Sequence, residues 1–151
     1  MSVLKMDREQ SSMQFITTAR ELFAATMNYT SMLSNRRWRV FGDRVVSLAQ
    51  EVLVEVGKSN GIFPRDEQSK AQRLYHLYEA AGSLNSLSLL LTVVYETIRS
   101  NPQGAFMNKN EKPLSADKSL EKLSKMSQNI GNLLTQESSL ISGQIQKYSQ
   151  Q

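Results

Sequence analysis

Apolar side chains recur every three or four residues along most of the chain, which is the spacing of one face of an α-helix. Four segments carry this pattern, and they predict helices at about 11–34, 40–59, 65–100 and 115–142. The longest stripe lies in the third segment, at Leu74, Leu77, Ala81, Leu84, Ser88, Leu91, Tyr95 and Ile98. A helix of that length would span roughly 50 Å at about 1.5 Å per residue, so we expect it to be the central helix.

Polar and turn-forming residues separate the four segments. All three prolines lie in such stretches, where they interrupt no helix: Pro64, Pro102 and Pro113. We expect a flexible N-terminus at 1–10, a loop at 101–114 and a polar C-terminal tail at 143–151. A loop of that length inside a compact domain is uncommon and is often functional or mobile.

Four amphipathic helices with short or moderate connections predict an all-α fold, an antiparallel up-down-up-down four-helix bundle over residues 11–142. A bundle needs one buried stripe per helix. The second and third helices carry apolar residues beyond that stripe, namely Val46, Leu53, Leu87, Leu90 and Val94. This surplus indicates a second packing surface and hence self-association.

The composition removes most kinds of catalytic chemistry. The chain of 151 residues has no cysteine and one histidine, His76, so thiolate sites and sites with several imidazoles are excluded. A lone imidazole, with Glu79 as a candidate hydrogen-bond partner, is typical of a structural or partly exposed histidine. No Walker loop, Rossmann glycine pattern or G-x-S-x-G elbow occurs. We therefore expect no catalytic residue, no metal, no cofactor and no enzymatic activity.

Two further patterns bear on the compartment. No run of about 18 apolar residues is present, so we expect no membrane-spanning helix. The first ten residues lack the apolar core of a signal peptide. Both patterns favour a cytoplasmic protein that does not bind a membrane.

The most informative charge pattern lies at 35–44, with the sequence NRRWRVFGDR. The net charge of the whole chain is +4, and four arginines are concentrated in this stretch, at Arg36, Arg37, Arg39 and Arg44. Arginine forms bidentate contacts with phosphate and stacks on bases. The only tryptophan, Trp38, lies among them, and an aromatic residue among arginines suits single-stranded nucleic acid.

A second interpretation of this stretch stays open. Trp38 would then close the end of the bundle, and the arginines would be solvated or paired with acidic neighbours. Arg44 is the arginine most suited to such pairing, because Asp43 and Glu51 are both near it in sequence.

A second basic group lies around the start of the fourth helix. Lys118, Lys122 and Lys125 share one helix face, and they follow Lys109 and Lys112 of the loop. They form a candidate phosphate-binding stripe. Because acidic residues interleave with them, a simple solvated face is the alternative. The same interpretation applies to Arg65, Lys70 and Arg73 at the start of the third helix, which Asp66 and Glu67 offset.

Two stretches are specific enough to compare with a known family: Met27-Asn28-Tyr29-Thr30, and the basic-aromatic turn from Arg36 to Arg44 that closes on FGDR. Weaker matches are LAQEVL at 48–53, Arg73-Leu74, LNSL at 84–87 and the segment 123–134. Over about residues 13–135, the chain resembles small bacterial four-helix-bundle proteins. That family includes the accessory variability determinant (Avd) of diversity-generating retroelements and the proteins encoded in 23S rRNA intervening sequences.

The resemblance implies a homopentamer of four-helix protomers that has no catalytic role. It implies two partners, the retroelement reverse transcriptase and the template-repeat RNA, whose copying into mutagenised cDNA the protein would support. Five copies would carry about +20 together, enough for a salt-sensitive interaction with phosphates. The alternative function is a helical protein-interaction module that binds no nucleic acid.

Overall fold

The structure is a computed structural model that describes residues 3–34 and 38–149, with the side chains of residues 14–34 and 38–149. Within these residues the fold is all-α, as predicted, and its only β-type pairing is two isolated bridges. The four long helices are α1 (Val3–Ser31), α3 (Asp43–Asn60), α4 (Glu67–Ser100) and α5 (Ala116–Ser149). A short π-helix, η1 (Trp38–Gly42), leads directly into α3.

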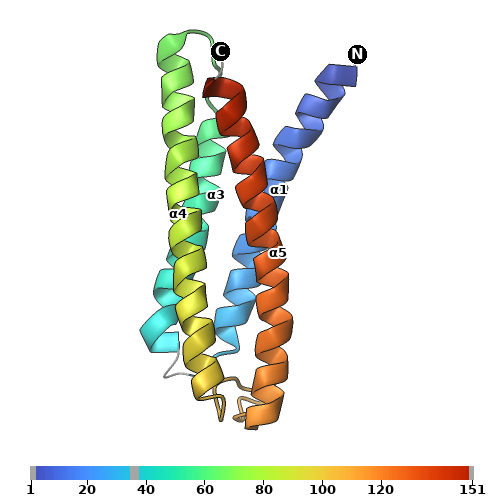
Figure 1. The fold of residues 1–151 in the computed structure, drawn as a ribbon, viewed down its shortest axis with the longest axis vertical. Helices are drawn as coiled ribbons and strands as arrows, with labels where there is room; N and C mark the ends of the chain where they lie inside the picture. Colours follow the sequence, from blue (N-terminus) through green and yellow to red (C-terminus); the bar gives the residue numbers. More distant parts are fainter. Residues whose placement is uncertain (1–2, 35–37, 150–151) are drawn as a thin grey trace.

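The four helices lie alongside one another around a shared core (Figure 1). α3 packs on α1 and α4, and α5 packs on α4 and α1. The end of α1, the start of α3 and the α4–α5 loop all lie at the lower end in Figure 1, which we call the turn end. The α3–α4 loop lies at the opposite end.

The apolar spacing of the first segment predicts a core-facing stripe at Ile16, Ala19, Phe23, Met27, Thr30 and Leu33. Ala19, Thr30 and Leu33 are buried as predicted, but the rest of the buried face is displaced by one residue. Phe15, Leu22 and Tyr29 are buried, whereas Met27, expected in the stripe, is 44% exposed. The buried face also includes Thr26 and Thr30, whose hydroxyls donate to the carbonyls of Leu22 (2.8 Å) and Thr26 (3.0 Å). Because each hydroxyl is satisfied within its own helix, the helix can turn these threonines toward the core.

Both ends of the helical region extend beyond the prediction. Of the expected flexible N-terminus 1–10, the described part is helical from Val3, because it consists mainly of residues that favour helix and lacks glycine and proline. The expected polar tail 143–151 is helical through Ser149. Here packing is the cause, since Ile145 and Tyr148 pack against the core and Gln144 is buried.

Side-chain caps fix the starts of α4 and α5. The Asp66 carboxylate accepts from the Ser69 backbone N–H at 2.8 Å, and the Ser69 hydroxyl accepts from the Asp66 backbone N–H, so the two residues form a capping box. The hydrogen bond from the Ser69 backbone lowers the pKa of Asp66. In the sequence, Ser115 and Asp117 are both candidate caps of the fourth helix. In the structure the Ser115 hydroxyl accepts from the Lys118 backbone N–H at 3.4 Å.

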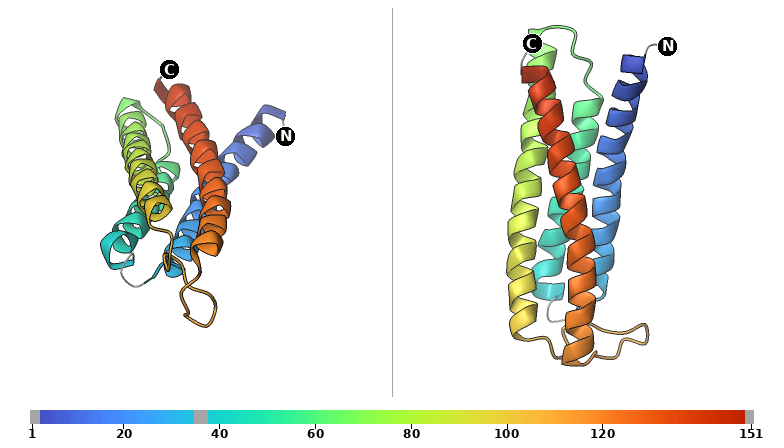
Figure 2. Two further views of the ribbon diagram at one scale, coloured as in Figure 1. Left: turned by 60° about the horizontal axis from the view of Figure 1, so that its bottom comes forward. Right: turned by 45° about the vertical axis from the view of Figure 1, so that its right-hand side comes forward.

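The α4–α5 loop, residues 101–115, is held against the end of α1. The Ser34 N–H donates to the Ala105 carbonyl and the Met107 N–H to the Met32 carbonyl, each at 2.9 Å. Phe106 is fully buried and meets the ring of Tyr29 edge to face, with ring centroids 5.9 Å apart. Figure 2 shows the rest of the loop extending sideways, away from the helices, at this end.

α4 differs from the other described helices in its apolar content. In the part of the chain that the structure describes, it is the one helix that is long and apolar enough to cross a membrane. Its most apolar window of 18 residues has a mean hydropathy of 1.3. A core helix of a soluble protein meets the same criteria, and α4 does pack on both α3 and α5. Only 28% of that window is buried, so much of this apolar surface faces outward.

Candidate nucleic-acid interface

The predicted basic-aromatic turn contains a π-helix. The Trp38 N–H donates to the Ser34 carbonyl at 2.9 Å, and the π-helical segment Trp38–Gly42 then continues into α3 without a break. Single π turns are rare and are found frequently at functional sites. Through Ser34, which also bonds to Ala105, the turn is connected to the 101–115 loop.

The indole of Trp38 packs over Gly42. A Cβ atom built on Gly42 would lie 2.2 Å from Cε3 of the indole and 2.6 Å from Cζ3, so only glycine admits the ring here. Trp38 remains 36% exposed, and its neighbour Val40 is 64% exposed. The indole is therefore packed against the backbone at Gly42 and partly open to solvent, and stacking on a base requires such an accessible ring.

The predicted arginines have different surroundings. Arg36 and Arg37 lie outside the described residues. Arg39 is exposed. The guanidinium of Arg44 lies 3.5 Å from the Glu51 carboxylate, and the two side chains are 62% and 45% exposed. An ion pair this exposed contributes little to stability, so Arg44 can exchange Glu51 for another anion at low energetic cost.

The predicted lysines lie on the first turns of α5, at the same end of the molecule. Lys118 and Lys125 are exposed, and Lys122 is half-buried. The loop adds Lys109 and Lys112, both exposed, and the backbone bonds of the loop to Met32 and Ser34 hold it at the turn end. The sequence grouped these two lysines with the fourth helix. The predicted up-down-up-down order already puts this loop at the end that carries the arginine turn, and the Leu33–Phe106 pairing, which no local pattern reveals, holds it against the end of α1.

Acidic side chains are interspersed among these cations. Asp43 begins α3, Glu111 lies in the loop, and Asp117 and Glu121 lie on the first turns of α5; all four are exposed. The turn end therefore carries basic side chains on separate elements, η1 and α3 on one hand and the loop and α5 on the other, together with a partly exposed indole. Basic side chains of this kind bind phosphates in general, and an exposed indole can stack on a base.

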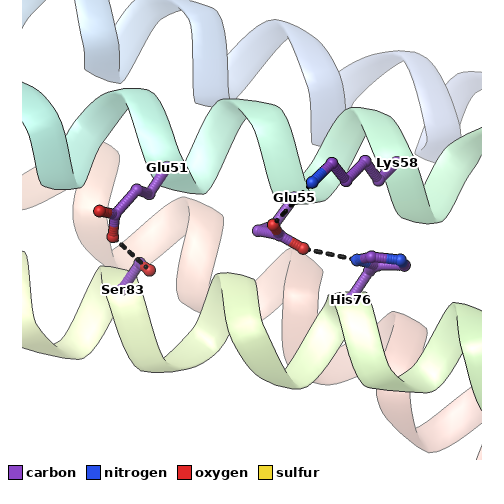
Figure 3. Close-up of polar contacts among 5 residues, drawn as sticks. All are labelled: Glu51, Glu55, Lys58, His76 and Ser83. Atoms are coloured by element: carbon purple, nitrogen blue, oxygen red, sulfur yellow. Dashed lines mark hydrogen bonds and ion pairs between the residues drawn. The ribbon is translucent and has the colours of Figure 1, made fainter.

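A separate polar cluster joins α3 to α4 (Figure 3). His76 Nδ1 lies 2.6 Å from Glu55 Oε2, and Lys58 Nζ lies 3.4 Å from Glu55 Oε1. The Ser83 hydroxyl donates to Glu51 at 3.1 Å. The partner of His76 is therefore Glu55, not the expected Glu79, because α3 presents Glu55 across the interface. This cluster is part of the packing between the two helices.

At the end opposite the turn end, Arg73 has a structural role. Arg73 is only 7% exposed, although a solvated face was expected. Its guanidinium donates to the Ile62 carbonyl at 2.8 Å and lies 4.5 Å from the centroid of the Tyr148 ring. Arg73 thus connects the α3–α4 loop to the end of α5.

Among the described residues, no group of three or more His, Cys, Asp or Glu side chains is arranged to hold a metal ion. Comparisons with protein-family models, curated proteins and solved structures return no match to this chain.

Proposed function

We propose that this protein is a non-enzymatic accessory subunit of a bacterial diversity-generating retroelement. In this role it binds the template-repeat RNA and the reverse transcriptase in the cytoplasm and supports mutagenic cDNA synthesis. In this proposal the protomer is an antiparallel up-down-up-down four-helix bundle that belongs to the Avd-like family. Five protomers assemble into a homopentamer.

One observation carries the RNA-binding part. A half-exposed tryptophan, fixed over Gly42, lies in a basic turn that is hydrogen-bonded to a loop with two exposed lysines. Cations bind phosphates without regard to sequence, and an indole can stack on any base. RNA binding by this end would therefore be salt-sensitive and tolerant of sequence.

The test measures the binding of a fluorescently labelled single-stranded RNA by anisotropy over a series of salt concentrations. The logarithm of the binding constant should fall linearly with the logarithm of the salt concentration. Changing Arg36 and Arg37 to Gln should flatten that slope by about 1.4 for each protomer that contacts the RNA, since each lost single-strand phosphate contact removes about 0.7. Changing Lys118, Lys122 and Lys125 to Gln tests the second predicted group in the same way.

A matched control removes two arginines elsewhere. Arg20 is exposed on α1, and Arg65 is exposed at the end opposite the turn end. The variant with Arg20→Gln and Arg65→Gln has the same net charge as the Arg36/Arg37 variant, and its slope should equal that of the parent. An equal decrease of the salt slope in the two variants would mean that RNA binding reflects net charge alone and has no site at the turn end.

The second candidate function is a helical protein-interaction module that binds no nucleic acid. It is favoured by the outward apolar side chains of α4, of which Leu89 is 63% and Val93 49% exposed. Absence of RNA binding by the parent at low salt would favour this module over the first proposal. Co-purification with a co-expressed reverse transcriptase tests the remaining partner.

A further inference from the structure

The middle of the α4–α5 layer presents no charged side chain to solvent. The sequence of α4 contains no Asp, Glu, Lys, Arg or His between Glu79 and Glu96. That of α5 contains one charged residue between Lys125 and Lys147, Glu137, and its side chain is fully buried. Two neighbouring helices thus form a surface with hydroxyl, amide and apolar groups only.

This surface is grooved. A hollow of about 440 Å³ lies between α4 and α5, lined on the α4 side by Ala81, Leu84 and Ser88 and on the α5 side by Leu134, Ser138 and Ser142. A second hollow of about 220 Å³ continues it toward the turn end and shares Ser88 and Leu134 with the first. The small side chains along both walls leave room for side chains from another surface.

A ridge runs along α4 beside this groove. It consists of Leu89 and Val93, which are 63% and 49% exposed and lie on the side of α4 away from the core. Their neighbours in sequence, Ser88 and Thr92, line the groove. Leu87 and Val94, which the sequence assigned to a second packing surface, are instead fully buried in the core. An exposed apolar ridge that lies next to an uncharged groove is typical of a surface that is buried in an assembly.

The chemistry of the face selects its occupant. A nucleic acid needs cations to neutralise its phosphates, and this face offers none. A surface with charged groups would lose their hydration here without gaining an opposite charge. The ridge of a second copy satisfies the requirement, because it is apolar and uncharged. Each chain has a net charge of +4. A contact at this uncharged face leaves the charged residues of both chains outside the interface, where they do not repel one another at short range.

We infer that the Leu89–Val93 ridge of one copy packs into the α4–α5 groove of a second copy. Ridge and groove are different surfaces of the same chain, so the contact is heterologous, and a heterologous contact repeated with the right rotation closes into a ring. This inference rests on the self-association in the proposed function, and it adds the surfaces through which the copies meet.

The chain has no cysteine, so engineered cysteines allow a direct test by crosslinking. Leu89→Cys labels the ridge, and Ser138→Cys labels the groove; both positions are exposed in the single chain. A mixture of the two variants, after co-refolding and mild oxidation, should give a disulfide-linked dimer at twice 17.1 kDa. Neither variant alone should give a comparable yield, and the double variant should give a ladder of crosslinked species.

A second pair of variants does not depend on disulfide geometry. Leu89→Glu places a charge on the ridge and should shift the mass measured by light scattering to that of the monomer. Val54→Glu places the same charge on α3, at a side chain that is 44% exposed, and should leave the oligomer intact.

The outcomes separate this inference from the proposed function. An oligomeric parent with no mixed crosslink, and with Leu89→Glu still oligomeric, overturns the α4–α5 contact and leaves self-association standing. Strong crosslinking of Leu89→Cys with itself replaces the heterologous contact by a two-fold one and also overturns the inference. A monomeric parent overturns both the contact and the proposed pentamer, whereas RNA binding is measured independently.

Discussion

The indole of Trp38 occupies the space that any side chain at position 42 would need. A Cβ atom on Gly42 would come within 2.2 Å of Cε3 and within 2.7 Å of Cδ2 of the ring. The overlap is with the fused part of a rigid bicycle, so no small rotation of a flexible side chain relieves it. The indole can therefore keep this position only if residue 42 is glycine.

Gly42→Ala should displace the indole and lower the free energy of unfolding by about 1–3 kcal/mol, the usual range for overpacking. Trp38 is the only tryptophan, so its fluorescence reports the displacement without interference. Urea unfolding gives the stability, and the emission maximum of the folded state gives the exposure of the ring. An unchanged emission maximum together with parental stability would contradict the packing of Trp38 on Gly42.

Gly57→Ala is the matched control, since a Cβ there meets no atom within 4 Å. Alanine is favoured over glycine inside a helix, so this variant should be more stable than the parent by about 0.5–1 kcal/mol. If Gly42→Ala lowers the free energy of unfolding and Gly57→Ala raises it, contact with the indole, and not helix propensity, decides the result at position 42.

Trp38→Ala should affect stability and RNA binding together. The ring is 36% exposed, so we expect a loss of about 2 kcal/mol, below the roughly 3–5 kcal/mol for a fully buried large aromatic. RNA affinity should fall by roughly 5- to 150-fold, as base stacking contributes about 1–3 kcal/mol per base. Melting curves and anisotropy measure the two effects, and Phe63→Ala, at a side chain 76% exposed, should change stability by less than about 0.5 kcal/mol. If neither property responds to Trp38→Ala, both interpretations of this residue fail.

The helices of this protein could be predicted from sequence because their signals are local. Periodic apolar positions located all four helices, and Ser115 was predicted as a possible cap of the last one. The buried face of α1 differs from the predicted stripe in including Thr26, whose hydroxyl is satisfied within its own helix and which resembles a surface residue in a hydropathy pattern. The extension of α5 depends on Tyr148 packing against the core, which is a tertiary contact and leaves no local signal.

The candidate site was predictable only as a set of residue types. Arg39 and Trp38 stand out in the sequence by charge and rarity. The sequence already groups Lys109 and Lys112 with the lysines of the fourth helix. It does not indicate the long-range backbone pairing between Leu33 and Phe106 that holds their loop against the end of α1. The pairing of His76 with Glu55 was missed for the same reason, since the two residues come from different helices.

Tyr29→Phe should stabilise the protein. The hydroxyl of Tyr29 is buried without a hydrogen-bond partner, and burial raises the pKa of this phenol above its usual range. A buried polar group without a partner costs about 1–3 kcal/mol, and phenylalanine removes it while keeping the edge-to-face contact with Phe106. We expect the free energy of unfolding in urea to rise by about 1 kcal/mol. Tyr78→Phe, at a side chain 57% exposed, is the control and should have little effect. A clear loss of stability in Tyr29→Phe would mean that the hydroxyl has a partner in solution.

Glu137 should make the stability of this protein depend on pH in the direction opposite to that of a salt-bridged carboxylate. Its side chain is fully buried, neither carboxylate oxygen has a hydrogen-bond partner, and burial raises the pKa from 4.5 to about 8. Between these two values the unfolded chain releases the proton while the folded chain retains it. The unfolded state then binds fewer protons, so the free energy of unfolding falls as pH rises, by about 1.4 kcal/mol per pH unit at most.

Glu137→Gln removes this titration and keeps the size of the side chain. Its free energy of unfolding should exceed that of the parent by a few kcal/mol at pH 8, and the difference should shrink toward zero at pH 5, on the order given by the linkage relation. Urea unfolding of both proteins across this range measures the difference. Glu21→Gln, at an exposed position of α1, should leave the pH dependence of the parent intact. Parallel curves for the parent and Glu137→Gln would mean that the carboxyl of Glu137 is ionised in the folded state, which requires either a cationic partner or access of water to this part of α5.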